Sequence, residues 1–178
     1  AAEEARARWR TEERPARATY TYRPPATSRF DPVDGHCEPN FAYGYVAEAV
    51  TVDVDVETGH LRLLEVCCVD DVGRVIIPQT ARGQVEGAIV QAQGYAVQEN
   101  FLQPGGLVQS AHLSTYLIPT VLDIPEDIET VLHESSDPRG PWGARGMGEM
   151  PLLPLTPALT AAIHNATGIW FDAFPLTP

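Results

Sequence analysis

Hydrophobic and polar residues alternate most clearly between residues 46 and 71. Valine stands at every second position from Val50 to Val56, and threonine or aspartate fills the positions between. This is the period of a β-strand with one face toward solvent. Residues 57–60 supply a turn, because their glycine can adopt a positive φ. The segment that follows, to residue 69, therefore predicts the returning strand of a β-hairpin.

The same alternation decides how the acidic residues of this hairpin are interpreted. Asp53 and Asp55 fall on the polar side of the first strand. We interpret them as solvent-face residues rather than as a metal-binding pair, because one face of an antiparallel sheet is commonly hydrated.

A second pattern, with the period of an α-helix, covers residues 81–100. Its apolar stripe is formed by Val85, Ile89, Ala92 and Ala96. Gly83, Gly87 and Gly94 each lower the helix propensity by about 1 kcal/mol relative to alanine. They predict that something packs very close to the helix, either a neighbouring element or a cofactor. Gln84 lies in the predicted first turns, where free amides and the positive end of the dipole favour a polar or anionic ligand.

The remaining elements are shorter. Thr156 and Pro157 predict a helix start and Gly168 its end, which gives a helix over residues 157–166. Four further segments are predicted: a helix within residues 1–14, an edge strand at 19–23, and strands at 114–118 and 128–134. The expected fold is α+β, with antiparallel strands packed against helices. The expected organisation is an irregular segment with a short helix at 1–40, followed by one domain over 41–178.

Composition narrows the classes of protein to which the chain belongs. The 178 residues suit one domain or two small subdomains, and 44% hydrophobic residues are enough for a core. Twelve basic residues against 24 acidic ones give a net charge of −12, which disfavours nucleic acid or an anionic membrane as a partner. No apolar run has the length of a membrane span. We expect a cytoplasmic protein.

The cysteines and histidines predict no metal centre and no disulfide framework. The three cysteines, Cys37, Cys67 and Cys68, are odd in number and lack CxxC spacing. The five histidines have no partner at the spacing of metal ligands. The chain begins at Ala1 without a methionine, which suggests a fragment or a processed piece.

The most unusual stretch is the glycine and proline loop at residues 138–154. It has four glycines within nine residues, from Gly140 to Gly148, interleaved with four prolines, so it cannot form a regular helix or a central strand. One carboxylate, Glu149, lies in it, before an apolar run. In a partly desolvated pocket a carboxylate has a raised pKa and acts as a general base. A solvated surface loop without chemistry fits the composition equally well.

In several segments the sequence resembles the molybdenum hydroxylases of the xanthine dehydrogenase and aldehyde oxidase type. The resemblance is to the C-terminal part of their molybdopterin-binding large subunit. It rests on the hairpin VTVDVDVETGHLRLLEVCCVDDVGRVIIP, on GQVEGAIVQAQG at 83–94, on STYLIPTVLDIP at 114–125 and on GARGMGEMPLLPLTPALTAAIHNATG at 143–168. The chain departs from the family at Ile77-Pro78, where relatives usually have Asn-Pro.

The resemblance implies a role for each matching residue. Glu149 matches the catalytic base of an oxidative hydroxylation of an N-heterocycle or aldehyde. Gln84 matches a glutamine that hydrogen-bonds the pterin. The remaining cofactor-binding residues that it implies are Arg145, whose charge meets the cofactor or fixes the loop, and Gly146, Met147 and Gly148, which line the metal centre.

The same resemblance implies cofactors and partners. The expected cofactor is molybdenum with molybdopterin, and iron–sulfur clusters and FAD are expected only on partner chains or domains. The expected partners are the remainder of the large subunit, the iron–sulfur and flavin subunits or domains, and a small-molecule substrate, within an oligomer. The isolated chain is expected to be inactive. The alternative is a structural or assembly module with the same fold, and the intact Glu149 favours the enzyme. Glu48 and Glu86 have no base-like setting in the sequence.

Overall fold

The computed structural model describes residues 1–11 and 14–177, and the chain divides into two compact units, Ala1–Phe41 and Ala42–Pro178. In the first unit the helix α1, Ala2–Arg10, carries an ion pair between Arg8 and Glu4 and has no buried residues. The predicted helix extended to residue 14, but residues 12 and 13 lie outside the described part. The predicted edge strand at 19–23 is wrong, because no other strand pairs with it among the described residues.

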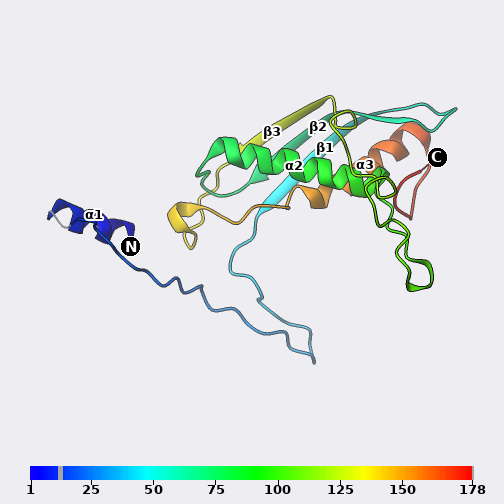
Figure 1. Cartoon of the computed structure of the whole chain (residues 1–178). Helices are drawn as coiled ribbons and strands as arrows, with labels where there is room; N and C mark the ends of the chain where they lie inside the picture. The colour runs from blue at the N-terminus through cyan, green and yellow to red at the C-terminus, as the bar shows by residue number, and fades with distance from the viewer. Residues whose placement is uncertain (12–13, 178) are drawn as a thin grey trace. The chain divides into compact units, whose positions relative to one another are not determined.

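The second unit is a three-stranded sheet with two helices on one face (Figure 1). Its strands are β1 (Tyr45–Val54), β2 (Leu61–Asp71) and β3 (Asp127–His133), in the order β1-β2-β3. Its helices are α2 (Pro78–Val97) and α3 (Leu152–Thr167), and the 3₁₀ turns Pro104–Gly106 and Pro141–Gly143 lie in the loops. The α+β class is confirmed.

The sheet is mixed rather than antiparallel, which corrects the expected strand arrangement. β1 and β2 form the predicted hairpin, whereas β3 runs parallel to β2. A parallel neighbour requires a crossover connection, and α2 with the loop after it supplies that connection. The sequence predicted the separate strands, but their direction depends on where α2 returns the chain.

A β-bulge determines which side chains of β2 face the helices. Thr51 pairs with Glu65 and Val52 pairs with Leu63, so Leu64 is the extra residue. Odd-numbered residues point inward before the bulge, and even-numbered residues point inward after it. Without the extra residue, the polar Glu65 would have faced the core.

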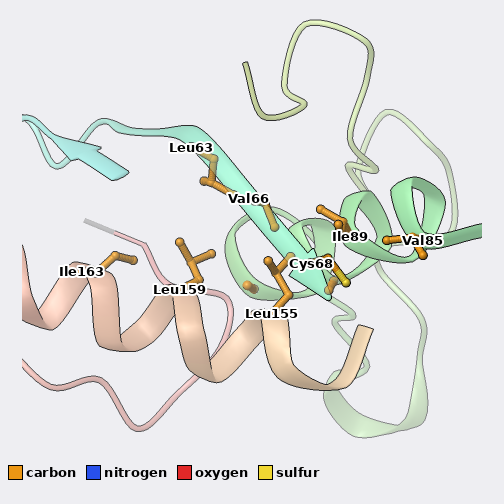
Figure 2. Close-up of a cluster of buried hydrophobic side chains, with 10 residues drawn as sticks. Leu63, Val66, Cys68, Val85, Ile89, Leu155, Leu159 and Ile163 are labelled. Carbon is orange, nitrogen blue, oxygen red and sulfur yellow. The ribbon is translucent and has the colours of Figure 1, made fainter. Parts of the chain in front are cut away.

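The core lies between β2 and the two helices, as Figure 2 shows. Leu63, Val66 and Cys68 of β2 meet side chains of α2 and α3, and most of these residues are completely buried. The remaining members of this cluster are Val85, Ile89, Ala92, Ala96, Leu155, Leu159 and Ile163. α3 packs over β1 and also contacts α2. The apolar stripe predicted from residues 81–100 is therefore confirmed.

Both long helices begin earlier than the sequence predicted. α3 starts at Leu152, after Pro151, so Pro157 lies inside the helix rather than at its first position. Leu152 lies five residues before Pro157, the expected first helical position, and its amide donates to the Glu149 carbonyl. Gly168 ends the helix with φ 77°, as predicted. The predicted strand at 114–118 is wrong, because this segment forms a turn in which the Thr115 and Tyr116 amides donate to the His112 carbonyl.

The glycines of α2 differ in their surroundings. A Cβ on Gly94 would lie 2.7 Å from Cδ of Pro119 and would also strike Glu99. At Gly83 and Gly87 nothing lies within 4 Å of that position. Close packing is thus confirmed at Gly94 and wrong at Gly83 and Gly87, which face open space.

Two carboxylates, Glu48 and Asp70, point toward the helices from neighbouring strands. Glu48 pairs with Cys68 across the hairpin, and Asp70 pairs with Val46. All four carboxylate oxygens are buried. Those of Asp70 have no hydrogen-bond partner among the described residues, and Glu48 faces only the weakly donating thiol of Cys68 there. Burial raises the pKa of Glu48 to about 7, and the charge of Asp70 adds to this effect. Burial also raises the pKa of Asp70. The description of Glu48 as a residue without a base-like setting is therefore wrong.

We predict that this pair makes stability fall as the pH rises. Between pH 4.5, the usual pKa of Glu48, and about 7, the folded chain holds a proton that the unfolded chain releases. The free energy of unfolding should decrease across that window, and Glu48→Gln should reduce the decrease. Urea unfolding at a series of pH values measures it. Glu65→Gln, on the exposed face of β2, is the matched control. Equal pH profiles for the wild type and Glu48→Gln would contradict the prediction.

Candidate functional site

The glycine and proline loop is tied to the end of β2 by backbone hydrogen bonds. The Arg145 amide donates to the Val72 carbonyl at 2.8 Å, and the Arg74 amide donates to the Gly143 carbonyl at 2.8 Å. Gly143 has φ 86° and a Cβ there would strike Ser136, so this position requires glycine. The loop is therefore held by the sheet over its first half, and its second half leads into α3.

Arg145 is the charged centre of this attachment. Its guanidinium lies 3.5 Å from Asp71 and 3.8 Å from Asp137, and Nη1 donates to the Tyr43 carbonyl at 2.8 Å. The side chain is 13% exposed and that of Asp137 only 6%. Its charge is thus balanced by two carboxylates of this chain, which favours the loop-fixing role for Arg145. The implied contact between Arg145 and the cofactor stays a prediction.

Glu149 lies between the glycines and the first turn of α3. One carboxylate oxygen, Oε1, accepts a hydrogen bond from Nε2 of Gln91 on α2 at 3.0 Å. The sequence predicted a partly desolvated carboxylate, but the side chain is exposed, because no segment in the described part of the chain covers it.

Gln84 reaches the same region from the second turn of α2, not from the first turns as the sequence suggested. It is exposed and lines a cavity of about 290 Å³ together with Met147 and Arg145. Apolar side chains form most of the remaining wall: Val72, Val75, Ile76, Ile77, Ala81 and Ala144. The structure therefore brings three of the predicted cofactor-binding residues to one hollow.

The surfaces near Glu149 leave room for a group to approach the backbone. Nothing lies within 4 Å of a Cβ position at Gly87, Gly146 or Gly148, and Gly148 has φ 131°. Gln84, Gly87 and Gln91 share one face of α2, because spacings of three and four residues return to the same side of a helix. A heterocycle with many hydrogen-bonding atoms fits these neutral amides beside bare backbone. The residues present thus fit a pterin.

Four other cavities among the described residues are larger than the hollow lined by Gln84, but none of the four contains a predicted site residue. One cavity of about 630 Å³ lies along β3, two of about 540 Å³ adjoin the tip of the hairpin, and one of about 370 Å³ lies beside Trp142. In residues 1–11 and 14–177, no three His, Cys, Asp or Glu side chains are grouped to hold a metal ion. Across the same residues, no helix combines the length and the apolar character that a membrane crossing needs.

The chain matches the family model described as the molybdopterin cofactor-binding domain over residues 1–125. That range includes Gln84 and ends before the Glu149 loop. The chain belongs to this family. The match confirms the molybdenum hydroxylase resemblance and the association with a molybdenum–molybdopterin cofactor.

Proteins similar to this chain include enzymes of known type. A probable xanthine dehydrogenase subunit of Bacillus subtilis (strain 168) is 35% identical over 147 residues, which is 83% of this chain and 19% of the relative. Aldehyde oxidoreductase from Desulfovibrio gigas has a TM-score of 0.76 at 30% identity, over 82% of this chain and 16% of that one. Quinoline 2-oxidoreductase from Pseudomonas putida 86 has a TM-score of 0.65 at 32% identity, over 70% and 16%. The chain therefore spans less than a fifth of each relative.

We predict that Arg145 contributes strongly to stability. Arg145→Ala would leave Asp71 without its cation and would leave Asp137 to the exposed Arg139, and breaking a buried pair in this way costs about 3 kcal/mol. Urea unfolding of the chain measures the loss. Arg139→Ala is the control, because Arg139 also pairs with Asp137 at 3.8 Å but is 53% exposed, and exposed pairs contribute at most about 1 kcal/mol. Equal losses in the two variants would contradict the prediction.

Proposed function

We propose that this chain is the C-terminal portion of the molybdopterin-binding subunit of a molybdenum hydroxylase, with Glu149 as the catalytic base. One observation carries the proposal. The Glu149 carboxylate stands beside open glycine backbone and faces Gln91 on the helix that also bears Gln84. A base, a pterin-binding amide and bare backbone therefore occupy one surface of the molecule.

Each residue has a separate task in this proposal. When bound, the molybdenum–molybdopterin group supplies the oxidising centre of the reaction. Gln84 holds the pterin through its side-chain amide, and Gly146 and Gly148 let the backbone approach the group without a side chain between them. Met147 adds apolar surface to the hollow that it shares with Gln84.

Glu149 accepts the proton that is released when oxygen is transferred to the substrate. Gln91 occupies Oε1, so Oε2 remains for this proton. A base works best where water is excluded, and in this chain Glu149 is exposed. The proposal therefore requires the remainder of the large subunit to cover this surface. The 290 Å³ hollow is slightly smaller than the usual range for small-molecule pockets, about 300–1,000 Å³, so other segments would complete it.

We propose an aldehyde or an N-heterocycle as the substrate. Similarity to an aldehyde oxidoreductase and to a quinoline 2-oxidoreductase supports both classes. Iron–sulfur and flavin groups on partner subunits or domains would carry the electrons away. The Bacillus subtilis relative is itself named as one subunit of an enzyme, which supports such an assembly. Without these partners the isolated chain would be inactive.

We predict that Glu149→Gln abolishes most of the turnover of the assembled enzyme. Glutamine keeps the size of the side chain but cannot accept a proton, and a positioned base contributes about 10² to 10⁴-fold. Steady-state turnover of an aldehyde and of quinoline, at equal molybdenum content, measures the effect. Glu86→Gln, on the exposed surface of α2, is the control. Glu48 does not serve as one, because its carboxylate is buried in the core.

If the Glu149→Gln enzyme turned over at the wild-type rate with full cofactor, Glu149 would not be the base and the loop would have only a structural role. That outcome would favour the alternative, a structural or assembly module with the same fold.

We predict that Gln84→Ala lowers the molybdenum content of the purified enzyme. Gln84 is exposed on α2, where alanine is the better helix former, so its removal should not unfold the helix. Metal analysis and thermal unfolding, measured on the same preparation, separate loss of cofactor from loss of fold. Gln79→Ala, in the first turn of α2, is the matched control. Full molybdenum content in Gln84→Ala would remove Gln84 from the site.

A further inference from the structure

The side chain that holds Glu149 comes from another part of the chain. Gln91 Nε2 lies 3.0 Å from Glu149 Oε1, and the two residues are 58 positions apart in sequence. Among the described residues no other hydrogen bond is made to the Glu149 carboxylate. The contact joins the middle of α2 to the start of α3. Its existence depends on the packing of these two helices against each other.

Helix geometry leaves Gln91 free to act on Glu149. Gln91 lies two turns after Gln84, roughly 10 Å along the axis and on the same face. Gly87 stands between them with nothing within 4 Å of a Cβ position. Gln91 is exposed, so it is not needed to fill the core. By contrast, Gln93 on the opposite side of α2 is buried and donates to the Asp123 carbonyl.

A primary amide suits this contact better than a charged donor. The Gln91 N–H fixes the rotation of the carboxylate, and it adds no charge that would compete for the proton. It occupies one oxygen and leaves the other free. A lysine at this position would pair with the base as a cation and would hold it as the anion far more strongly.

We propose that Gln91 is a positioning residue that holds the Glu149 carboxylate oriented toward the reacting group. This inference rests on the proposed function of Glu149 as a base, but it assigns to Gln91 a task separate from that of Gln84. Gln91 orients the base, whereas Gln84 binds the cofactor.

The test uses the assembled enzyme with Gln91→Ala and Gln91→Glu. Loss of a hydrogen bond to a charged group should lower kcat/KM about 10- to 100-fold at unchanged molybdenum content. Because the ionised carboxylate loses its donor, the acid limb of the pH–rate profile should move to higher pH. Gln91→Glu places a second negative charge beside Glu149 and should move the acid limb to still higher pH. Gln79→Ala, exposed on the same helix, should leave both quantities unchanged.

A second measurement does not depend on turnover. Infrared difference spectra between the wild type and Glu149→Gln isolate the carboxyl band of Glu149, and its titration midpoint should rise in Gln91→Ala. In the Glu149→Gln background, Gln91→Ala should cause no further loss of kcat/KM, because the two residues act through one carboxylate.

The two measurements separate the failure of this inference from that of the proposed function. An unchanged carboxyl midpoint and an unchanged acid limb in Gln91→Ala would overturn the role of Gln91. A shifted midpoint together with wild-type turnover in Glu149→Gln would support the contact between the two residues and overturn the base. Reduced molybdenum content in Gln91→Ala without a shifted midpoint would overturn positioning and make Gln91 a cofactor ligand like Gln84.

Discussion

The burial of β2 against both long helices is the constraint on which the candidate site depends. Val66 of the strand, Ile89 of α2 and Leu155 of α3 belong to one buried hydrophobic cluster (Figure 2). This packing fixes α2 beside α3, and it therefore brings Gln91 within hydrogen-bond distance of Glu149. Gln91 lies on α2 and Glu149 precedes α3, so loss of the shared core would separate the two side chains.

Charge is distributed unequally around this core. Arg145 is held by Asp71 and Asp137, and it anchors the first half of the glycine loop to the sheet. Glu149, four residues later, has only a neutral donor, Gln91, among the described residues. A cation beside Glu149 would hold it as a bound anion, whereas an amide orients it and leaves one oxygen available. The structure thus separates the charge that fixes the loop from the carboxylate proposed to act.

The buried pair Glu48 and Asp70 illustrates what one extra residue does in a strand. The alternation in β1 already placed Glu48 on the face of its neighbouring valines, so its burial could have been recognised from the sequence. Asp70 faces inward only because Leu64 is bulged and reverses the inward parity of β2. The resulting proximity of two carboxylates could not be predicted, because register depends on cross-strand pairing.

The sequence by itself determined the hairpin, the apolar stripe of α2, the end of α3 at Gly168 and the presence of a glycine loop around Glu149, because each follows from local periodicity or backbone restriction. It misplaced the start of α3, because the Thr156 and Pro157 signal lies inside the helix, and it predicted a strand at 114–118 where the backbone forms a turn. Only the tertiary structure decided that β3 is parallel, that Gly87 faces open space and that Gln91 meets Glu149. These features are set by non-local packing, which joins residues far apart in the chain and leaves no periodic signal within it.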